Sequence, residues 1–173
     1  MIISGARLSG VKISGTPSVF IGDTSNTQTP TLGSGTSIST LTGVSSPTSP
    51  FSGVSMGAYN LNNSVNGYFT VPASSDWAFG TGDFTVEWFQ YQTDSNSHPR
   101  IFAIGTYPSQ TIGCSIEGGT FYAWCSGANS FGSAVTYKST WVHFAIVRYG
   151  STLKVYKNGT AMSAGISNST NIN

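Results

Sequence analysis

Carboxylates are the first residues to consider for chemistry, and this sequence has few of them. Among 173 residues there are six aspartates and glutamates. Hydrolysis of a glycosidic bond needs two carboxyl groups that flank the bond, and residues two apart on a strand share one face. Glu87 lies in a long alternating segment, but its neighbours at that spacing are Thr85 and Phe89. We therefore predict a structural hydrogen bond for Glu87, no catalytic residues, and a chain that is not an enzyme.

Metal ligands are equally sparse. Calcium takes several oxygen ligands, whereas Asp83 and the Asp94-Ser95-Asn96 stretch offer isolated ones, which are typical of local turn hydrogen bonds. His98 stands in a polar stretch, and His143 stands in a strand-like one. We expect His143 to be partly buried with a hydrogen-bond partner. The sequence predicts no metal and no cofactor, with calcium at these turns as the weaker alternative.

The two cysteines, Cys114 and Cys125, flank a Gly118-Gly119 turn that predicts a β-hairpin. With a two-residue loop, Cys114 faces Ala123 rather than Cys125. The two sulfurs then share one face as diagonal neighbours, which is a poor geometry for a disulfide. We expect two buried free thiols in preference to a bridge.

Aromatic side chains form the most informative candidate site. Tyr122 and Trp124 alternate with apolar residues along the hairpin and so point away from the core, and Phe89 and Tyr91 do the same along their own segment. Exposed rings stack on the C–H faces of sugars, while polar neighbours bind the hydroxyls. The predicted carbohydrate-binding residues are Tyr122, Trp124, Phe89, Tyr91, Gln90 and Asn129, with Gln92 and Ser126 as further polar companions. The alternative is that residues 1–50 or a neighbouring subunit cover this face.

Composition excludes several classes of partner. Charged residues make up 8% of the chain and the net charge is +1, whereas the average charged content is about 25%. A nucleic-acid binder needs many Lys and Arg contacts to phosphate, and a membrane span needs an apolar run of about 20 residues. We therefore predict no nucleic-acid partner and no membrane insertion. Residues 1–7 also lack the apolar stretch of a signal peptide.

The chain divides into two parts by composition. Residues 1–50 are rich in Ser, Thr and Gly and contain one aromatic residue, Phe20, which predicts an extended arm or linker. From residue 51 onward, short alternating stretches are separated by turn signals such as Asn158-Gly159. This pattern predicts an all-β fold with antiparallel strands, a sandwich or a barrel. The expected strands lie at 68–71, 84–92, 101–104, 111–117, 120–125, 141–148, 153–157 and 160–162, with one helical turn at 74–79.

Two long motifs carry a family resemblance. Tyr68 to Pro72 leads into GTGDFTVEWF at residues 80–89, and WVHFAIVR at 141–148 is followed by LKVYKNG at 153–159. In this order the motifs closely resemble the laminin-G-like, concanavalin A-like jelly-roll family, over about residues 51–162. The resemblance implies an antiparallel β-sandwich of the jelly-roll type. It says much less about function, because one fold hosts many functions.

The sequence departs from the family pattern in two places. Trp88-Phe89 reverses the Phe-Trp order of the family, and the residues after Met162 lack its final strands. We therefore expect residues 51–173 to form the jelly-roll domain without its last strands. A longer chain or a neighbouring chain would supply them.

The resemblance, together with a neutral and hydroxyl-rich surface, implies a non-enzymatic virion structural protein, such as a phage tail fibre or a capsid decoration protein. In this hypothesis residues 1–50 dock on other virion proteins. The sandwich is displayed for adhesion to host-surface glycans or for particle stabilisation, and the chain forms a homo-oligomer, with a trimer favoured. The alternative is a carbohydrate-binding module of an adhesin on a bacterial cell surface.

Overall fold

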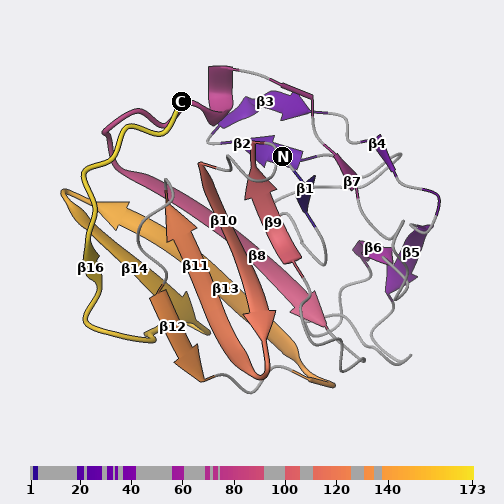
Figure 1. Ribbon diagram of the computed structural model, residues 1–173. Helices are drawn as coiled ribbons and strands as arrows, with labels where there is room; N and C mark the ends of the chain where they lie inside the picture. The colour runs from indigo at the N-terminus through magenta and orange to yellow at the C-terminus, as the bar shows by residue number, and fades with distance from the viewer. Residues whose placement is uncertain are drawn as a thin grey trace.

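A computed structural model gives the arrangement of the chain (Figure 1). The residues that it describes are 2–3, 19–21, 23–28, 31–32, 34, 37–41, 56–60, 69–70, 72–73, 75–91, 100–105, 111–125, 131–134 and 138–173.

Two antiparallel sheets contain most of the described strands. The larger is seven-stranded, in the order β12 (Phe131–Ala134), β11 (Thr120–Cys125), β10 (Ile112–Glu117), β9 (Arg100–Ile104), β1 (Ile2–Ile3), β7 (Phe69–Thr70) and β4 (Thr31–Leu32). The smaller is five-stranded, with β15 (Thr160–Ala161), β14 (Thr152–Lys157), β13 (Trp141–Tyr149) and β8 (Phe84–Tyr91) in order, and β16 (Ile166–Ser167) also paired to β14.

Two further pairs and one short helical element complete the described structure. The pairs are β2 (Val19–Ile21) with β3 (Asp23–Gln28), and β5 (Ser37–Leu41) with β6 (Met56–Asn60). The sole helical element of the described ranges is the 3₁₀ turn η1 (Ser75–Trp77), where a helical turn was expected. Every described pairing is antiparallel. The predicted all-β class is therefore confirmed.

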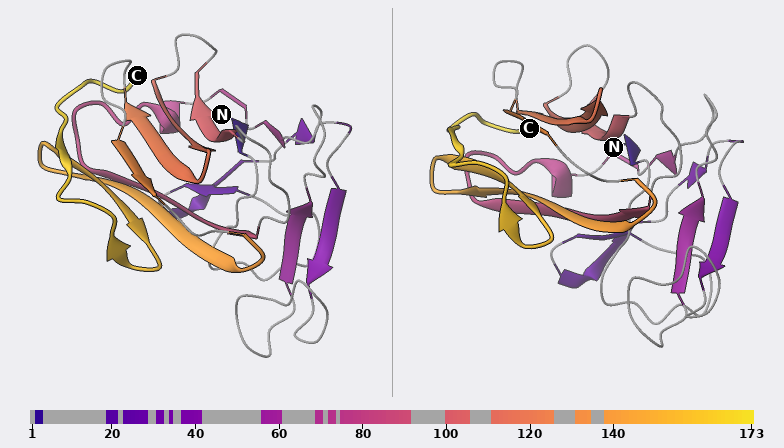
Figure 2. Two further views of the ribbon diagram at one scale, coloured as in Figure 1. Left: turned by 60° about the horizontal axis from the view of Figure 1, so that its bottom comes forward. Right: turned by 90° about the horizontal axis from the view of Figure 1, so that it is seen from below.

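The two main sheets lie as two layers (Figure 2), and their facing sides share one apolar core. Trp88 of β8 lies at the centre of this core and contacts rings from both sheets. Its ring centroid is 5.7 Å from Phe102 of β9, 6.3 Å from Phe121 of β11 and 5.7 Å from Phe144 of β13. All four residues are at most 3% exposed. The alternation that predicted Phe84, Val86 and Trp88 on one side of β8 is confirmed, because these side chains pack in or against the core.

The hairpin turns follow from residues that tolerate positive φ. Gly118 and Gly119 have φ of +56° and +82°, and Asn158 and Gly159 have φ of +48° and +78°. A two-residue type I′ turn requires positive φ at both positions, which glycine and asparagine adopt at the lowest cost. The glycine turn sets the register predicted for β10 and β11, in which Cys114 pairs with Ala123.

The residues after Met162 return across the small sheet. Ile166 pairs with Leu153 of β14, and the backbone of Ile172 exchanges two hydrogen bonds with Gly80, at 2.8 and 2.9 Å. Ile172 is fully buried. This segment, 163–173, therefore belongs to the folded unit and contributes β16 to the small sheet.

Arg148 of β13 holds this C-terminal segment in place. The side chain is 1% exposed, and no carboxylate is among its described hydrogen-bond partners. Instead the guanidinium donates to the carbonyl oxygens of Gly80, Gly82 and Thr170 at 2.6 to 2.8 Å. It also lies 4.9 Å from the ring centroid of Phe84. We call this arrangement the Arg148 clamp; it joins the turn before β8 to residues 168–170.

Residues 1–50, predicted to be an extended arm, contribute strands to the larger sheet. β1 pairs with both β7 and β9, and β4 pairs with β7. The segment therefore adds backbone to the sheet that the resemblance assigned to residues 51–173.

Candidate functional site

The register of β8 and β13 builds an aromatic surface on the outer side of the small sheet. Phe89 lies opposite His143, and Tyr91 lies opposite Trp141. The ring centroids are 4.8 Å apart in the first pair and 5.6 Å apart, edge to face, in the second. All four side chains are half-buried. We call these four residues the β8–β13 aromatic patch.

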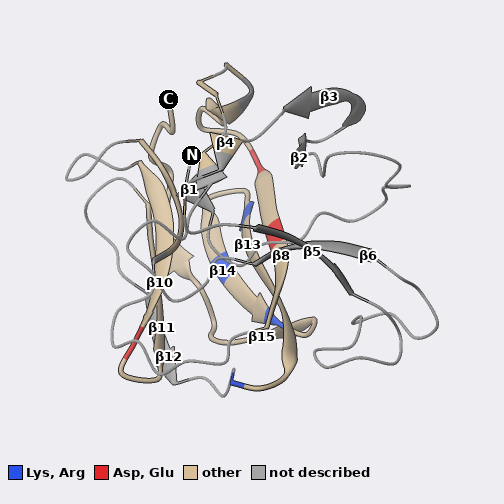
Figure 3. Cartoon of the chain, turned by 90° about the vertical axis from the view of Figure 1, so that its right-hand side faces the viewer, with Lys and Arg blue, Asp and Glu red and all other residues tan. Residues whose placement is uncertain are grey.

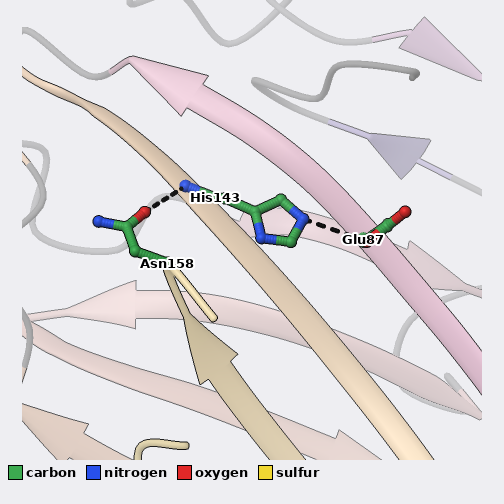
Figure 4. Close-up of polar contacts among 3 residues, drawn as sticks. All are labelled: Glu87, His143 and Asn158. Carbon is green, nitrogen blue, oxygen red and sulfur yellow. Dashed lines mark hydrogen bonds and ion pairs between the residues drawn. The ribbon is translucent and has the colours of Figure 1, made fainter. Parts of the chain in front are cut away.

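A hydrogen-bonded polar group borders this patch (Figure 4). Nε2 of His143 lies 3.1 Å from Oε2 of Glu87. The backbone N–H of His143 donates to Oδ1 of Asn158 at 2.9 Å, and the N–H of Asn158 donates to the carbonyl of His143 at 2.8 Å. These bonds fix the β13 backbone at His143 while Glu87 restrains its ring. The predictions of a partnered His143 and of a structural hydrogen bond for Glu87 are confirmed.

Tyr122 and Trp124 lie on the outer side of the larger sheet, as their alternation predicted. Both are half-buried, while Phe121, Ala123 and Cys125 between and beside them are buried. Trp124 pairs with Gly113 of β10. A Cβ atom at Gly113 would come within 2.5 Å of the indole Cζ2. The indole therefore lies against the backbone at Gly113, in space that any other residue would fill.

The predicted carbohydrate-binding residues do not form one site. Phe89 and Tyr91 belong to the small sheet, and Tyr122 and Trp124 belong to the larger one. The inner faces of β8 and β11 meet in the core, where Trp88 contacts Phe121. The outer faces therefore point in opposite directions, and one sugar chain segment cannot stack on both pairs.

Gln90 was predicted to bind carbohydrate from the outer face, and this position is also wrong. Its side chain is 4% exposed and lies on the core side of β8, where Oε1 accepts a hydrogen bond from the Trp88 indole at 2.9 Å. Alternation along the strand already places Gln90 with Trp88 and not with Phe89. Gln90 therefore supports the core and does not accompany the outward rings. Asn129, Gln92 and Ser126 lie outside the described residues.

Trp141 and His143 were not among the predicted carbohydrate-binding residues. Both stand at alternate positions of β13, on the side away from Phe144 and Ile146. The signal was present in that alternation, but the pairing of β13 with β8 was needed to bring these rings to Phe89 and Tyr91. Pairing between strands 50 residues apart cannot be read from either strand alone.

The cysteines are two buried free thiols, as predicted. Burial is the largest cause of a raised pKa at both, and it holds the pKa of Cys114 well above its usual value. At Cys125 the nearby Arg148 and a hydrogen bond to Asn168 partly oppose the rise in pKa. Since the thiolate is the nucleophilic form, both thiols are poor nucleophiles in the folded chain.

Neither metal clusters nor membrane helices occur within the described ranges. No group there places three or more His, Cys, Asp or Glu side chains together in a way that could hold a metal ion. The described part of the chain also has no helix long and apolar enough to cross a membrane. Charged residues are few in the described part of the chain, and their positions are spread over several strands and turns (Figure 3).

The close approach at Gly113 leads to a first testable prediction. We expect Gly113→Ala to lower the free energy of unfolding by about 1–3 kcal/mol, because the new methyl overpacks against Trp124 and the Phe102 carbonyl. Urea denaturation measures the loss, with Gly82→Ala as the control, since a Cβ there meets its nearest atom at 3.6 Å. In a Trp124→Ala background part of the cost should vanish. An equal cost in both backgrounds would contradict the packing of Trp124 against Gly113.

Comparison with known proteins adds no relative. No family model matches the chain, and no curated protein or solved structure matches it. The laminin-G-like resemblance therefore remains a prediction from the motifs.

Proposed function

We propose that this chain is a non-enzymatic jelly-roll domain of the concanavalin A-like type, and that it serves as a virion structural protein which adheres to host-surface glycans. Two observations support the sandwich. The two main sheets share one core, and the family-like motifs supply three strands of the small sheet, β8, β13 and β14. The rings and polar groups on the outer sheet faces support glycan binding without a metal or a cofactor.

The β8–β13 aromatic patch is the observation that carries this proposal. Its rings lie in two adjacent pairs along neighbouring strands, which is an arrangement that can stack on consecutive sugar rings. Glu87 and His143 add polar groups at one end, next to Phe89. Sugar sites combine such apolar surface with a few fixed polar groups. Tyr122 and Trp124 are the second candidate surface, without an ionisable pair of this kind described beside them.

Residues 1–50 serve in this proposal as the assembly segment. β1 and β4 add short strands to the larger sheet, and strand addition is a common way for extended segments to dock on a neighbour. Docking between copies would give a homo-oligomer, with a trimer favoured, and would stabilise the particle. Many weak sugar contacts on such a particle then add up to avidity. The alternative, a carbohydrate-binding module of a bacterial surface adhesin, uses the same patch on a monomer.

Binding by paired variants tests the proposal. We expect the chain to bind host-surface polysaccharides on a glycan array, and Tyr91→Ala/Trp141→Ala to weaken binding about tenfold or more, because buried aromatic contacts dominate such interfaces. Tyr122→Ala/Trp124→Ala is the matched control from the other sheet, and circular dichroism checks that both variants fold.

Each outcome of this test has a definite meaning. No binding by the folded wild type would contradict the glycan function. Loss of binding in the control variant alone would move the site to the larger sheet. The mass of the chain in solution, by light scattering, distinguishes the two contexts: a trimer favours the virion protein, and a monomer favours the adhesin module.

A further inference from the structure

We infer that Glu87 and His143 restrict the β8–β13 aromatic patch to neutral, hydroxyl-rich glycans and disfavour acidic ones. This inference rests on the proposed function. It goes further by naming the charge class of the ligand and the two residues that select it. The atoms of these two side chains that donate or accept hydrogen bonds decide which charge class can bind.

Glu87 presents an acceptor on an exposed surface. Its side chain is 52% exposed, and Oε2 is the oxygen that contacts His143. Within the described part of the chain, Oε1 takes no hydrogen bond. An ionised carboxylate accepts hydrogen bonds and donates none, and those from hydroxyl groups are strengthened by its charge. Oε1 is therefore available to a sugar hydroxyl.

His143 presents a second acceptor beside the first. Its side chain is 24% exposed, and Nε2 points to Glu87. A neutral imidazole that donates from Nε2 keeps Nδ1 as an acceptor. When the ring is this neutral tautomer, the polar end of the patch offers acceptors at both Oε1 of Glu87 and Nδ1 of His143. Adjacent sugar hydroxyls can donate to both, whereas a carboxylate or sulfate group can donate to neither.

The charge around Glu87 is not balanced by a basic residue in register with it. In β13 its partner is Ala145, and beyond that, in β14, the row continues to Tyr156. Lys154 of β14 belongs to the neighbouring row, which runs through Val147 of β13 to Thr85 of β8. It therefore lies two strands away from β8. With the His143 ring neutral, an acidic sugar at Phe89 would therefore meet the like charge of Glu87 in the adjacent row, whereas the described Lys154 lies one row further and two strands away. Like charges brought together in an interface are disfavoured, which gives selectivity by repulsion.

The test compares five polymers against three forms of the protein. The neutral probes are a β-1,3-glucan, a galactomannan and dextran, and the acidic probes are polygalacturonate and heparin. The variants are Glu87→Gln, whose carbonyl can still accept from His143, and Glu117→Gln, which removes a charge from β10 of the other sheet. Affinity electrophoresis in gels containing each polymer gives the relative binding constants.

We expect the wild type and Glu117→Gln to bind at least one neutral polymer about tenfold more tightly than either acidic one. Glu87→Gln should bind that neutral polymer roughly threefold more weakly, because a neutral hydrogen bond replaces a charge-assisted one. Glu87→Gln should also bind the acidic polymers more tightly. In the wild type, added salt screens the repulsion and should reduce the ratio of neutral-polymer to acidic-polymer binding constants.

The charge selectivity and the glycan function can fail separately in this experiment. The proposed charge selectivity is wrong if the wild type binds polygalacturonate or heparin as tightly as the neutral polymers. It is also wrong if Glu87→Gln leaves the ratio of neutral-polymer to acidic-polymer binding constants unchanged. Glycan binding itself stands in both cases. If the wild type binds none of the five polymers, the proposed glycan function fails and the selectivity fails with it.

Discussion

Replacing Arg148 with methionine is expected to lower the free energy of unfolding by about 3–5 kcal/mol. The substitution keeps much of the apolar stem but removes every donor from the Arg148 clamp. The partly buried carbonyls of Gly80, Gly82 and Thr170 then lose these hydrogen bonds, although Gly80 keeps the one from the Ile172 N–H. An acceptor left unsatisfied away from water costs about 1–3 kcal/mol, and the buried end of the side chain loses its packing as well. Since whole domains are stable by about 5–15 kcal/mol, this variant should be marginally folded.

Urea denaturation followed by circular dichroism measures this effect. Arg148→Lys should lose somewhat less, because an ammonium keeps the charge but cannot reproduce the planar fork that reaches three carbonyls. Lys154→Met, on the neighbouring strand, is the control for loss of a cation and should change stability by about 0.5 kcal/mol or less. Hydrogen exchange should rise first at residues 168–172. If Arg148→Met lowers the free energy of unfolding no more than Lys154→Met does, the clamp does not hold the C-terminal segment.

Replacing Trp88 with alanine is expected to cost about 3–5 kcal/mol, the range for large aromatic side chains in cores. The physical reason is the position of the indole, which contacts Phe102, Phe121 and Phe144 from both sheets. Its removal leaves a cavity where the two layers meet. Oε1 of Gln90 also loses the hydrogen bond that the indole N–H donates. The surrounding strands can collapse only partly into that space, because the sheet hydrogen bonds hold them.

The neighbouring residue supplies the matched control for this prediction. Phe89 precedes Gln90 on the same strand but points to the outer side and is half-buried. Phe89→Ala should therefore cost clearly less than Trp88→Ala in the same denaturation experiment. Trp88→Phe should lie between them, since it keeps a ring in the core and loses the indole donor. Equal losses at positions 88 and 89 would argue against a core between the two sheets.

Local patterns predicted much of the fold. Alternation assigned the two sides of β8 and β11, the Gly118-Gly119 turn set the β10–β11 register, and Asn158-Gly159 closed the β14–β15 hairpin. These features depend on residues close in the sequence, so local chemistry is sufficient to predict them. The same alternation would also have placed Gln90 in the core, had it been applied to polar residues as strictly as to apolar ones.

Other features depend on residues far apart in the chain. The grouping of four aromatic residues into one candidate site was wrong, because alternation shows which side of its own sheet a residue occupies but not where that sheet lies. The Arg148 clamp was also missed. An arginine in a strand predicts an exposed charge unless the carbonyls that surround it are known, and these come from residues 66 to 68 positions before it and 22 after it.

The sequence by itself determined the all-β class, the outward direction of Tyr91 and Trp124, the free thiols and the partnered His143. Each follows from strand periodicity and turn chemistry, which act over a few residues. The tertiary structure alone decided that β8 lies beside β13, that Phe89 and Tyr91 meet His143 and Trp141, and that Glu87 stands at their polar end. Strand pairing depends on how two sheets bury their apolar faces together, and that is a property of the whole chain.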